Sequence, residues 1–425
     1  IGVMLGGLSL GNLIGGKVAD RITSEKQASW LFLVASAIVL LILFLETPPA
    51  FLGEELAGSS VLSYASVMEG LPWSLRVPVV ALMFFLPSIT MGTVSPVVTK
   101  LAIDRLRQAN RTGAAIGSVY AWGMVGSIVG TFLAGFWLID LMGTKGVILT
   151  LATAMALVAT ALGGIGHAAW AGIPLGLTFI AFAPMPMLQR QGVAWGVRNI
   201  SGNPKAETGI AHLDESNYYY IKVESAVVPE PKEPGKETEP EGTSASPTAI
   251  RRTLVLDNLI HGYFILGHPE HIEYDYEYIY AQVTRRVAEA KAKRLGLENP
   301  SEVPLRALFL GGGSYTFPRY LQHRYPNAVC DVAEIDPAVT EANHVALGLP
   351  RDTTIQTHWG DARQFVERSL GGEPYDLIFG DAFNDFSVPW HLTTREFNER
   401  IAQLLDDHGA YMINIIDVYR SDKVA

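Results

Sequence analysis

The stretch LRALFLGGGSY, from Leu305 to Tyr315, decides the fold of the second half of this sequence. Its first six residues are mostly apolar and predict a buried strand. The glycines that follow allow positive φ, and they let a ligand approach the backbone and the N-terminus of the next helix. The sequence therefore predicts a ligand-binding turn at Gly311, Gly312, Gly313 and Ser314.

Apolar strands and amphipathic helices alternate through the rest of this half. The expected strands are LRALFL, AVCDVAEI, TIQTHW, YDLIFG and AYMINII, and the helices between them end near Arg324, Leu347, Leu370 and Leu405. Such βα repeats are typical of a parallel, doubly wound sheet. We predict a Rossmann-like α/β domain over residues 266–425, and we expect it to be truncated after the fifth strand.

Acidic residues follow three of the predicted strands. Glu334 lies 23 residues after Gly311, where an acid in such folds reaches the ribose hydroxyls. Asp361 follows the third strand and Asp381 follows the fourth. Because open α/β sheets bind ligands at the carboxyl ends of their strands, we expect these acids to converge on a nucleoside-type ligand.

Each acid also has a structural interpretation. Glu334 and Asp361 are placed to cap the helices that follow them, and Asp336, just before Pro337, has the sequence of an N-cap. Asp381 precedes a loop, so its structural alternative is solvation in that loop. The sequence leaves both interpretations open for each acid.

The first half differs sharply in composition from the second. The 425 residues are 49% hydrophobic and 17% charged, with a net charge of +3 on residues 1–200 and −13 on the remainder. We expect a membrane domain followed by an acidic soluble one, whose charge argues against nucleic acid as a partner. The single cysteine, Cys330, excludes an internal disulfide and multi-Cys metal sites, and it falls in a predicted buried strand. We expect no bound metal.

Hydropathy predicts about six membrane spans within residues 1–190, the first of them partial. They run near Ile1–Gly16, Ala28–Leu45, Val77–Val98, Gly117–Ile139, Gly146–Leu162 and Ala168–Ala183. Small residues such as Gly123, Gly126 and Gly130 predict close helix packing in a bundle within the lipid bilayer. No span has an ionisable residue near its centre, so the spans give no support to ion-coupled transport.

Basic residues give conflicting signals about sidedness. Lys17 and Arg21 follow the first span and Lys100 follows the third, which predicts cytoplasmic loops there. Six crossings would then place the second half outside, although Arg190 and Arg198 after the sixth span suggest the inside. We expect one of the last two spans to be re-entrant or interfacial, or the count to be wrong, and the soluble domain to lie on the cytoplasmic side of an inner or plasma membrane.

A connector over residues 191–212 leads to a β-hairpin region over residues 213–265. Its expected strands are ESNYYYIKVES and TLVLDNLIHGYFIL. The segment Val228–Thr248 between them is rich in Pro, Glu, Lys, Ser and Thr, which is typical of a disordered insertion.

Seven ordered motifs of the second half resemble the spermidine synthase (polyamine aminopropyltransferase) family, and more closely its membrane-fused relatives. The motifs are Glu215-Ser216-x-Tyr218, Leu256-Asp257, Tyr280, Gly311-Gly312-Gly313, Glu334-Ile335-Asp336, Gly360-Asp361, and Tyr375-Asp376-Leu377-Ile378 leading to Asp381. The resemblance covers residues 213–425 and the general layout of the first half.

The resemblance implies a role for each matching residue. Glu334 would hold the ribose of decarboxylated S-adenosylmethionine, Asp361 its adenine amino group, and Asp381 would orient and deprotonate the attacking amine. The products would be a longer polyamine and methylthioadenosine, and the protein would be a homodimer. Positions equivalent to the family's amine-binding and donor-tail residues are Tyr280, His261, Asn384 and Asp385.

Several positions depart from the family pattern. Ser314 replaces the Asp that grips the donor's amino group, His261 replaces a Gln, and Asn384 replaces the second Asp of the Asp-x-x-Asp loop, with Asp385 adjacent. Loss of a carboxylate at Ser314 removes a repulsion against intact S-adenosylmethionine. The alternatives are therefore a methyltransferase on the same fold, or a non-catalytic sensor or transporter that binds a nucleoside or a polyamine.

Overall fold

A computed structural model describes residues 2–46, 72–106, 112–199, 202–231, 247–383 and 388–415. The chain divides into two compact units, Ile1–Ile200 and Ser201–Ala425. Each unit has a hydrophobic core of its own.

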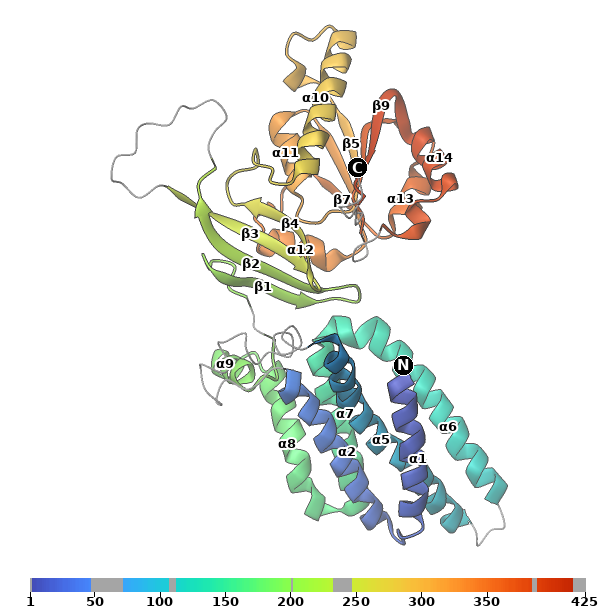
Figure 1. The fold of residues 1–425 in the computed structure, drawn as a ribbon. Coiled ribbons are helices and arrows are strands. Elements are labelled where there is room, and N and C mark those ends of the chain that lie inside the picture. Colours follow the sequence, from blue (N-terminus) through green and yellow to red (C-terminus); the bar gives the residue numbers. More distant parts are fainter. Residues whose placement is uncertain are drawn as a thin grey trace. The chain divides into compact units, whose positions relative to one another are not determined.

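The regular elements described in the first unit are all helices (Figure 1). Its elements are α1 (Gly2–Ala19), α2 (Glu25–Glu46), α5 (Trp73–Leu106), α6 (Thr112–Leu133), the π-helical turn η3 (Ala134–Leu138), α7 (Ile139–Gly163), α8 (Ile165–Phe182) and α9 (Pro186–Ala194). Four stretches are long and apolar enough to cross a membrane, judged by length and composition: Glu25–Phe44, Ser74–Arg105, Ile116–Gly163 and Ile165–Phe182. The third of these bends at Gly143, where φ is 68° and ψ is 169°.

Glycines allow α1 and α5 to pack in close contact. A Cβ built on Gly11 would lie 2.2 Å from the Ile89 carbonyl oxygen, and one on Gly15 would lie 2.7 Å from that of Thr93. The glycines expected to pack, Gly123, Gly126 and Gly130, have no described atom within 4 Å of such a Cβ. That expectation was wrong because small-residue spacing shows which helix face can pack closely, but it does not show which face has a neighbour.

Helices α2 and α8 run parallel to each other, and both run antiparallel to α7. Ser29 Oγ lies 3.1 Å from His167 Nε2, whereas seven residues later Ser36 donates to the Ala152 carbonyl at 2.8 Å. Thr153 and Thr178 meet midway along α7 and α8, with 3.0 Å between their hydroxyl oxygens. The expectation that one of the last two spans is re-entrant or interfacial stays a prediction.

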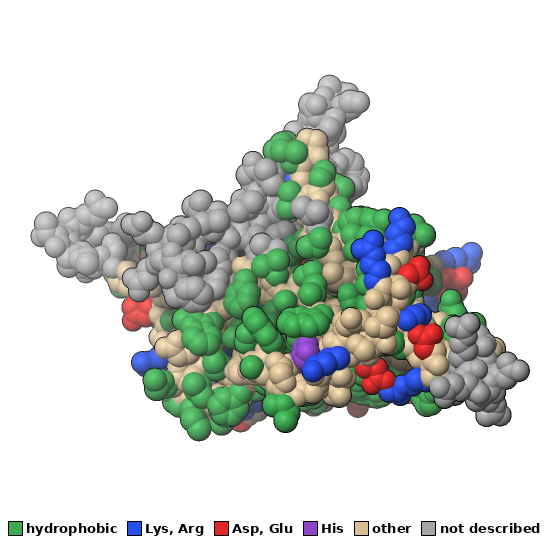
Figure 2. All heavy atoms as spheres, turned by 90° about the horizontal axis from the view of Figure 1, so that it is seen from below, with side chains coloured by type: hydrophobic (Ala, Val, Ile, Leu, Met, Phe, Trp, Pro, Cys, Tyr) green, Lys and Arg blue, Asp and Glu red, His purple; other side chains and the backbone are tan. Residues whose placement is uncertain are grey.

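The two ends of the helical unit differ in the helix ends and the basic residues that lie there. Lys100 donates to the carbonyl of Ile22, so the basic residues after α1 and along the last turn of α5 share the end at which α2 begins. Figure 2 shows this end, where hydrophobic side chains cover a broad area and the charged side chains gather towards one margin. The chain leaves α8 at the opposite end, where Leu177 and Ala181 pack against Leu43.

This arrangement predicts that two exposed positions, Ser24 and Gln191, can be reached from opposite sides of the membrane. Cysteines introduced by Ser24→Cys and Gln191→Cys should react with a membrane-impermeant maleimide from opposite sides of the membrane. Cys330 is fully buried, so the natural chain provides an almost unreactive background. Labelling of both positions from the same side of intact cells or spheroplasts would contradict the antiparallel arrangement.

The second unit begins with an antiparallel four-stranded sheet in the order β1-β2-β3-β4. Its strands are β1 (Gly209–Glu215), β2 (Tyr220–Pro229), β3 (Thr248–Leu256) and β4 (Leu259–Ile265). The predicted hairpin is thus present but larger than expected. Its second expected strand divides at Asp257, whose φ of 53° allows Leu256 to pair with Leu259 across a two-residue turn. Most of the expected insertion, residues 232–246, lies outside the described residues.

A five-stranded parallel sheet follows, in the order β7-β6-β5-β8-β9, which confirms the predicted doubly wound fold. Its strands are β5 (Arg306–Leu310), β6 (Val329–Glu334), β7 (Gln356–Trp359), β8 (Tyr375–Gly380) and β9 (Leu405–Ile413). The helices are α10 (Asp275–Leu295), α11 (Thr316–Arg324), α12 (Pro337–Val345), α13 (Ala362–Ser369) and α14 (Arg395–Leu404).

Alternate residues of the central strands face opposite layers of the sheet. Ala307 and Phe309 of β5 pack in a core with residues of α10 and α11, whereas Leu308 and Leu310 pack with residues of α13 and α14. Figure 1 shows these two helix pairs on either side of the sheet. Residues on both faces of β5 are thus buried, and the loops at the carboxyl ends of the strands remain available for a ligand.

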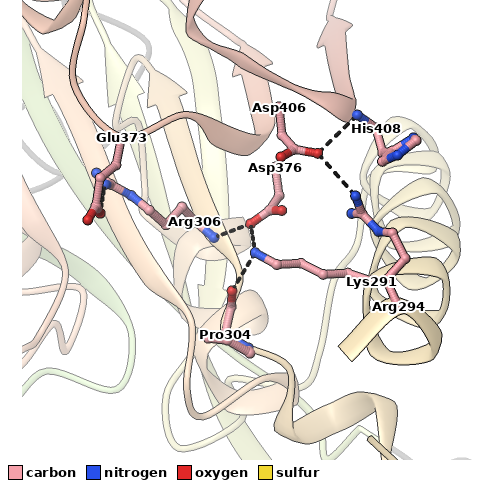
Figure 3. A network of polar contacts seen from close by, with 8 residues as sticks. All are labelled: Lys291, Arg294, Pro304, Arg306, Glu373, Asp376, Asp406 and His408. Atoms are coloured by element: carbon pink, nitrogen blue, oxygen red, sulfur yellow. Dashed lines mark hydrogen bonds and ion pairs between the residues drawn. The ribbon is translucent and has the colours of Figure 1, made fainter. Parts of the chain in front are cut away.

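A polar network ties α10 to the parallel sheet (Figure 3). The buried carboxylate of Asp376 accepts hydrogen bonds from Lys291 Nζ at 2.7 Å and from the Arg306 backbone N–H at 2.8 Å. Nearby, Arg294 and Asp406 form a more exposed ion pair at 3.5 Å.

The network predicts two very different effects on stability. Asp376→Ala should lower the free energy of unfolding by about 3 kcal/mol, because it leaves a largely buried ammonium and a backbone N–H without their shared partner. Arg294→Ala should cost less than about 1 kcal/mol because water screens that pair. Thermal unfolding of the detergent-solubilised chain measures both changes, and equal shifts in melting temperature would contradict the assignment.

Candidate functional site

A cavity of about 660 Å³ lies in the second unit, where the carboxyl ends of β5, β6 and β8 meet the turn between β3 and β4. It is lined by every predicted site residue that the structure describes: Gly311, Gly312, Gly313, Ser314, Glu334, Asp361, Asp381, Tyr280 and His261. Asn384 and Asp385 lie outside the described residues.

The glycine turn allows close approach between backbone segments, as the sequence predicts. Gly311 has a φ of 103°, and a Cβ there would lie 2.6 Å from the Asp381 carbonyl oxygen. A Cβ on Gly312 would lie 3.0 Å from the carboxylate of Glu334. Any larger residue at these positions would displace the very groups that line the cavity.

Glu334 ends β6 with its side chain almost fully buried at the cavity. Its Oε2 accepts a hydrogen bond from the Gly312 N–H at 2.8 Å, and its Oε1 accepts one from the Asp336 N–H at 2.9 Å. Burial raises the pKa of Glu334, and the backbone hydrogen bonds oppose that shift. Each oxygen keeps a further lone pair, so the carboxylate can still accept from two hydroxyls of a ligand.

Asp336 has the structural role that its sequence context indicates. Its Oδ1 accepts from the Ala338 N–H at 2.9 Å and caps α12, and its Oδ2 accepts from the Ser216 hydroxyl at 2.5 Å. Because Ser216 belongs to the segment between β1 and β2, Asp336 links the antiparallel sheet to the parallel one.

Asp361 both caps a helix and lines the cavity, so neither of the two interpretations that the sequence left open excludes the other. Its Oδ1 caps α13 by accepting from the Gln364 N–H at 3.0 Å. Its Oδ2 faces the cavity and lies 2.9 Å from His391 Nε2. His391, in the short 3-10 helix Trp390–Leu392, therefore joins the site. Its sequence context did not single this histidine out as a site residue.

Asp381 follows β8 with a side chain buried among hydrogen-bond donors. Asn414 Nδ2 donates to its Oδ1 at 2.9 Å, and the Tyr276 hydroxyl donates to its Oδ2 at 3.2 Å. Burial raises the pKa of Asp381 above its usual range, and these two hydrogen bonds partly offset the effect. A carboxylate so placed is a stronger base than a solvated aspartate and is suited to accept a proton.

Sequence reasoning missed Tyr276, Glu277 and Asn414. Tyr276 and Glu277 precede the predicted Tyr280 by four and three residues, so all three share one face of α10. That helical spacing was the available signal. Asn414 comes just after β9, at the carboxyl end of a strand next to β8, and only the strand order reveals its proximity to Asp381.

Ser314 lies where the resembling family has an acid, and its side-chain hydroxyl contacts another hydroxyl, while its carbonyl accepts from the Arg319 guanidinium. Its hydroxyl oxygen lies 2.7 Å from that of Thr316. It also packs tightly on β4, because a Cβ on Gly262 would lie 2.0 Å from the Ser314 hydroxyl oxygen. The cavity is therefore lined by a small neutral side chain at this position.

Comparisons with known proteins identify part of this unit. The polyamine aminopropyltransferase of Vibrio vulnificus is 38% identical over 119 residues, which cover 28% of this chain and 39% of that protein. The human eEF1A lysine and N-terminal methyltransferase is 23% identical over 133 residues, covering 28% of this chain and 19% of its own length. The chain thus spans well under half the length of each. No family model matches the sequence.

A probable spermidine synthase from Corynebacterium glutamicum is similar among solved structures, with a TM-score of 0.34, 22% identity, and coverage of 50% of this chain and 64% of that one. About 28% of the chain is therefore polyamine aminopropyltransferase-like in sequence, behind a helical unit with long apolar helices. Both curated relatives are transferases by name.

Proposed function

We propose that this chain transfers an aminopropyl group from decarboxylated S-adenosylmethionine to a polyamine such as putrescine. The observation that carries the proposal is the buried carboxylate of Asp381, which shares one cavity with the glycine turn and Glu334. The similarity to the Vibrio vulnificus polyamine aminopropyltransferase supports the same reaction class.

The proposed step needs a carboxylate because a protonated amine has no lone pair. Asp381 takes a proton from the acceptor ammonium, and the freed lone pair attacks the aminopropyl carbon beside the sulfonium. The new C–N bond forms as the C–S bond breaks, and both bonding electrons of the C–S bond remain on sulfur. The leaving group is neutral methylthioadenosine, and the lengthened polyamine is released as a cation.

The described residues suit the nucleoside part of this donor. Glu334 would accept from the ribose hydroxyls, and Asp361 would accept from the adenine amino group in competition with His391. Gly311 and Gly312 let the chain after β8 and the Glu334 carboxylate approach the turn closely at the edge of the cavity. The donor's sulfonium supplies the electrophilic carbon; this chain's own residues bind and orient the two substrates and move the proton.

The proposed reaction also requires one particular orientation of the helical unit in the membrane. The donor is made in the cytoplasm, so the Gln191 end of the helical unit must be the cytoplasmic one for the reaction to occur. The positive-inside rule instead favours the Ser24 end, which is richer in basic residues. Maleimide labelling of the two cysteine variants decides between these arguments, and Gln191→Cys reacting only from outside the cell would exclude the reaction.

A second candidate function rests on Ser314. With a neutral serine at this position, no carboxylate there repels the carboxylate of intact S-adenosylmethionine, and the similarity to an eEF1A methyltransferase is in keeping with that donor. The nucleoside product distinguishes the two reactions. Aminopropyl transfer releases methylthioadenosine, whereas methyl transfer releases S-adenosylhomocysteine.

A further inference from the structure

A second cavity lies in the helical unit, at the end where both α2 and α8 begin. This α2–α8 cavity has a volume of about 790 Å³. It is lined by Ser24, Lys26 and Trp30 at the start of α2, and by the turn Gly163–His167 that joins α7 to α8. None of the described residues that line it is acidic, so no carboxylate in its wall would attract a cation.

The α2–α8 cavity lies at the level where two of the apolar stretches begin. The stretch along α2 starts at Glu25, and the one along α8 starts at Ile165. Trp30 is 53% exposed beside the cavity, and an indole in such a position is typical of the interface between membrane and water. The cavity is therefore at the depth of lipid headgroups.

His167 places a buried polar atom without a partner at this cavity. The side chain is only 5% exposed. The Ser29 hydroxyl donates to the Lys26 carbonyl at 2.8 Å, so its oxygen accepts from His167 Nε2 at 3.1 Å. In the neutral ring Nδ1 is then an acceptor, and it is buried with no hydrogen-bond partner among the described residues. Native proteins usually satisfy such atoms, so a ligand with a hydroxyl group fits this position.

Gly163 keeps this edge of the imidazole ring uncovered. A Cβ built on Gly163 would lie 2.3 Å from His167 Nδ1 and 2.6 Å from Ser29 Oγ. Nδ1 therefore faces the turn that forms one wall of the cavity. Any side chain at this position would displace the histidine or its serine partner.

Lys26 gives the α2–α8 cavity a positive charge. In the part of the chain that the structure describes, Lys26 has no carboxylate partner. By contrast, Lys100 at the same end of the unit pairs with Asp104. The ammonium of Lys26 is thus available to an anion in the cavity.

The N-terminus of α8 adds donors to the same wall. The helix has 18 residues, and its N-cap Gly164 provides no side-chain cap. The first N–H groups of the helix are therefore without a side-chain acceptor, and the helix dipole places partial positive charge there. The N-terminus of α2 contributes a second dipole of the same sign.

We propose that the α2–α8 cavity binds a phosphate group that carries or adjoins a hydroxyl, as in the headgroup of phosphatidylglycerol or in free phosphate. Lys26 and the first N–H groups of α8 hold the phosphate oxygens, and the hydroxyl donates to His167 Nδ1. Trp30 covers the part of a lipid nearest the headgroup. This site lies in the helical unit and does not depend on the proposed transferase reaction.

The test compares two phospholipids that have the same acyl chains. Native mass spectrometry of the full-length detergent-solubilised protein measures the dissociation constants of phosphatidylglycerol and phosphatidylcholine. The wild type should bind phosphatidylglycerol at least about fivefold more tightly, because Lys26 attracts its net charge and choline has no hydroxyl for His167. Lys26→Gln should reduce this preference to less than about twofold. Lys17→Gln, the same change in the last turn of α1, should leave it unchanged.

A second variant separates binding from folding. Ile165 is 92% exposed at the first position of α8. A carboxylate there stabilises a helix N-terminus and repels a phosphate. Ile165→Glu should therefore remove the preference for phosphatidylglycerol without lowering the melting temperature of the protein.

Inorganic phosphate distinguishes the two sources of the ligand. Calorimetric binding of inorganic phosphate that requires Lys26, with no preference between the two lipids, would support the phosphate site and assign it to the free ion. The inference would be overturned by an equal lipid preference in the wild type, Lys26→Gln and Ile165→Glu. An equal loss in Lys17→Gln, or a wild type that shows neither a lipid preference nor phosphate binding, would overturn it as well.

Discussion

Asp381→Asn is expected to reduce methylthioadenosine formation by at least about 1,000-fold. Asparagine keeps the size of the side chain and can still accept from Asn414 or Tyr276, but its amide cannot take the proton of the acceptor. The loss should appear in kcat, because the proton transfer belongs to the chemical step. Steady-state kinetics with decarboxylated S-adenosylmethionine and putrescine measure it.

The matched control is Asp407→Asn, the same substitution at an exposed position of the same unit, which should leave kcat unchanged. The wild-type rate should fall on acidification at a pH above the usual range of an aspartate, because burial raises the pKa of Asp381 and only its ionised form accepts a proton. A variant Asp381→Asn with more than a tenth of the wild-type kcat would rule out this residue as the base.

Glu334→Gln is expected to weaken nucleoside binding about 100-fold. The carboxylate accepts from Gly312 and Asp336 with both of its oxygens, and a glutamine would place an NH2 group against one of these N–H donors. The variant would therefore disturb the glycine turn and lose an acceptor for the ribose hydroxyls. Isothermal titration of methylthioadenosine into the detergent-solubilised chain measures the dissociation constant.

Glu341→Gln is the control for this prediction, since Glu341 is exposed and pairs with Arg351 at the surface. Its dissociation constant for methylthioadenosine should equal that of the wild type. If Glu334→Gln also bound with unchanged affinity, Glu334 would be only a structural residue that holds the glycine turn.

The parallel domain was predictable because its signals are local and repeated. Strands β5, β6 and β8 are short apolar runs that end at Gly or an acid, and they lie where the sequence places them. The last strand begins at Leu405, five residues before the expected AYMINII, in a stretch assigned to the preceding helix and its loop. The convergence of Glu334, Asp361 and Asp381 then follows from the geometry of a parallel sheet.

Features that depend on contacts between distant segments were not predictable. His391 reaches Asp361 from a loop 30 residues away, and Asn414 reaches Asp381 from a neighbouring strand. The sequence does not give the distance between α10 and β8, so it did not single out Tyr276 as a neighbour of Asp381. Likewise, Asp257 divides an apolar run that the alternation pattern alone predicts to be one strand.

The most direct test of the central claim is mass spectrometry of the nucleoside product. The full-length membrane protein is incubated with putrescine and either decarboxylated or intact S-adenosylmethionine, with Asp381→Asn in parallel. The account predicts methylthioadenosine from the decarboxylated donor, lost in the variant. S-adenosylhomocysteine from the intact donor, with no methylthioadenosine, would contradict it and identify a methyltransferase.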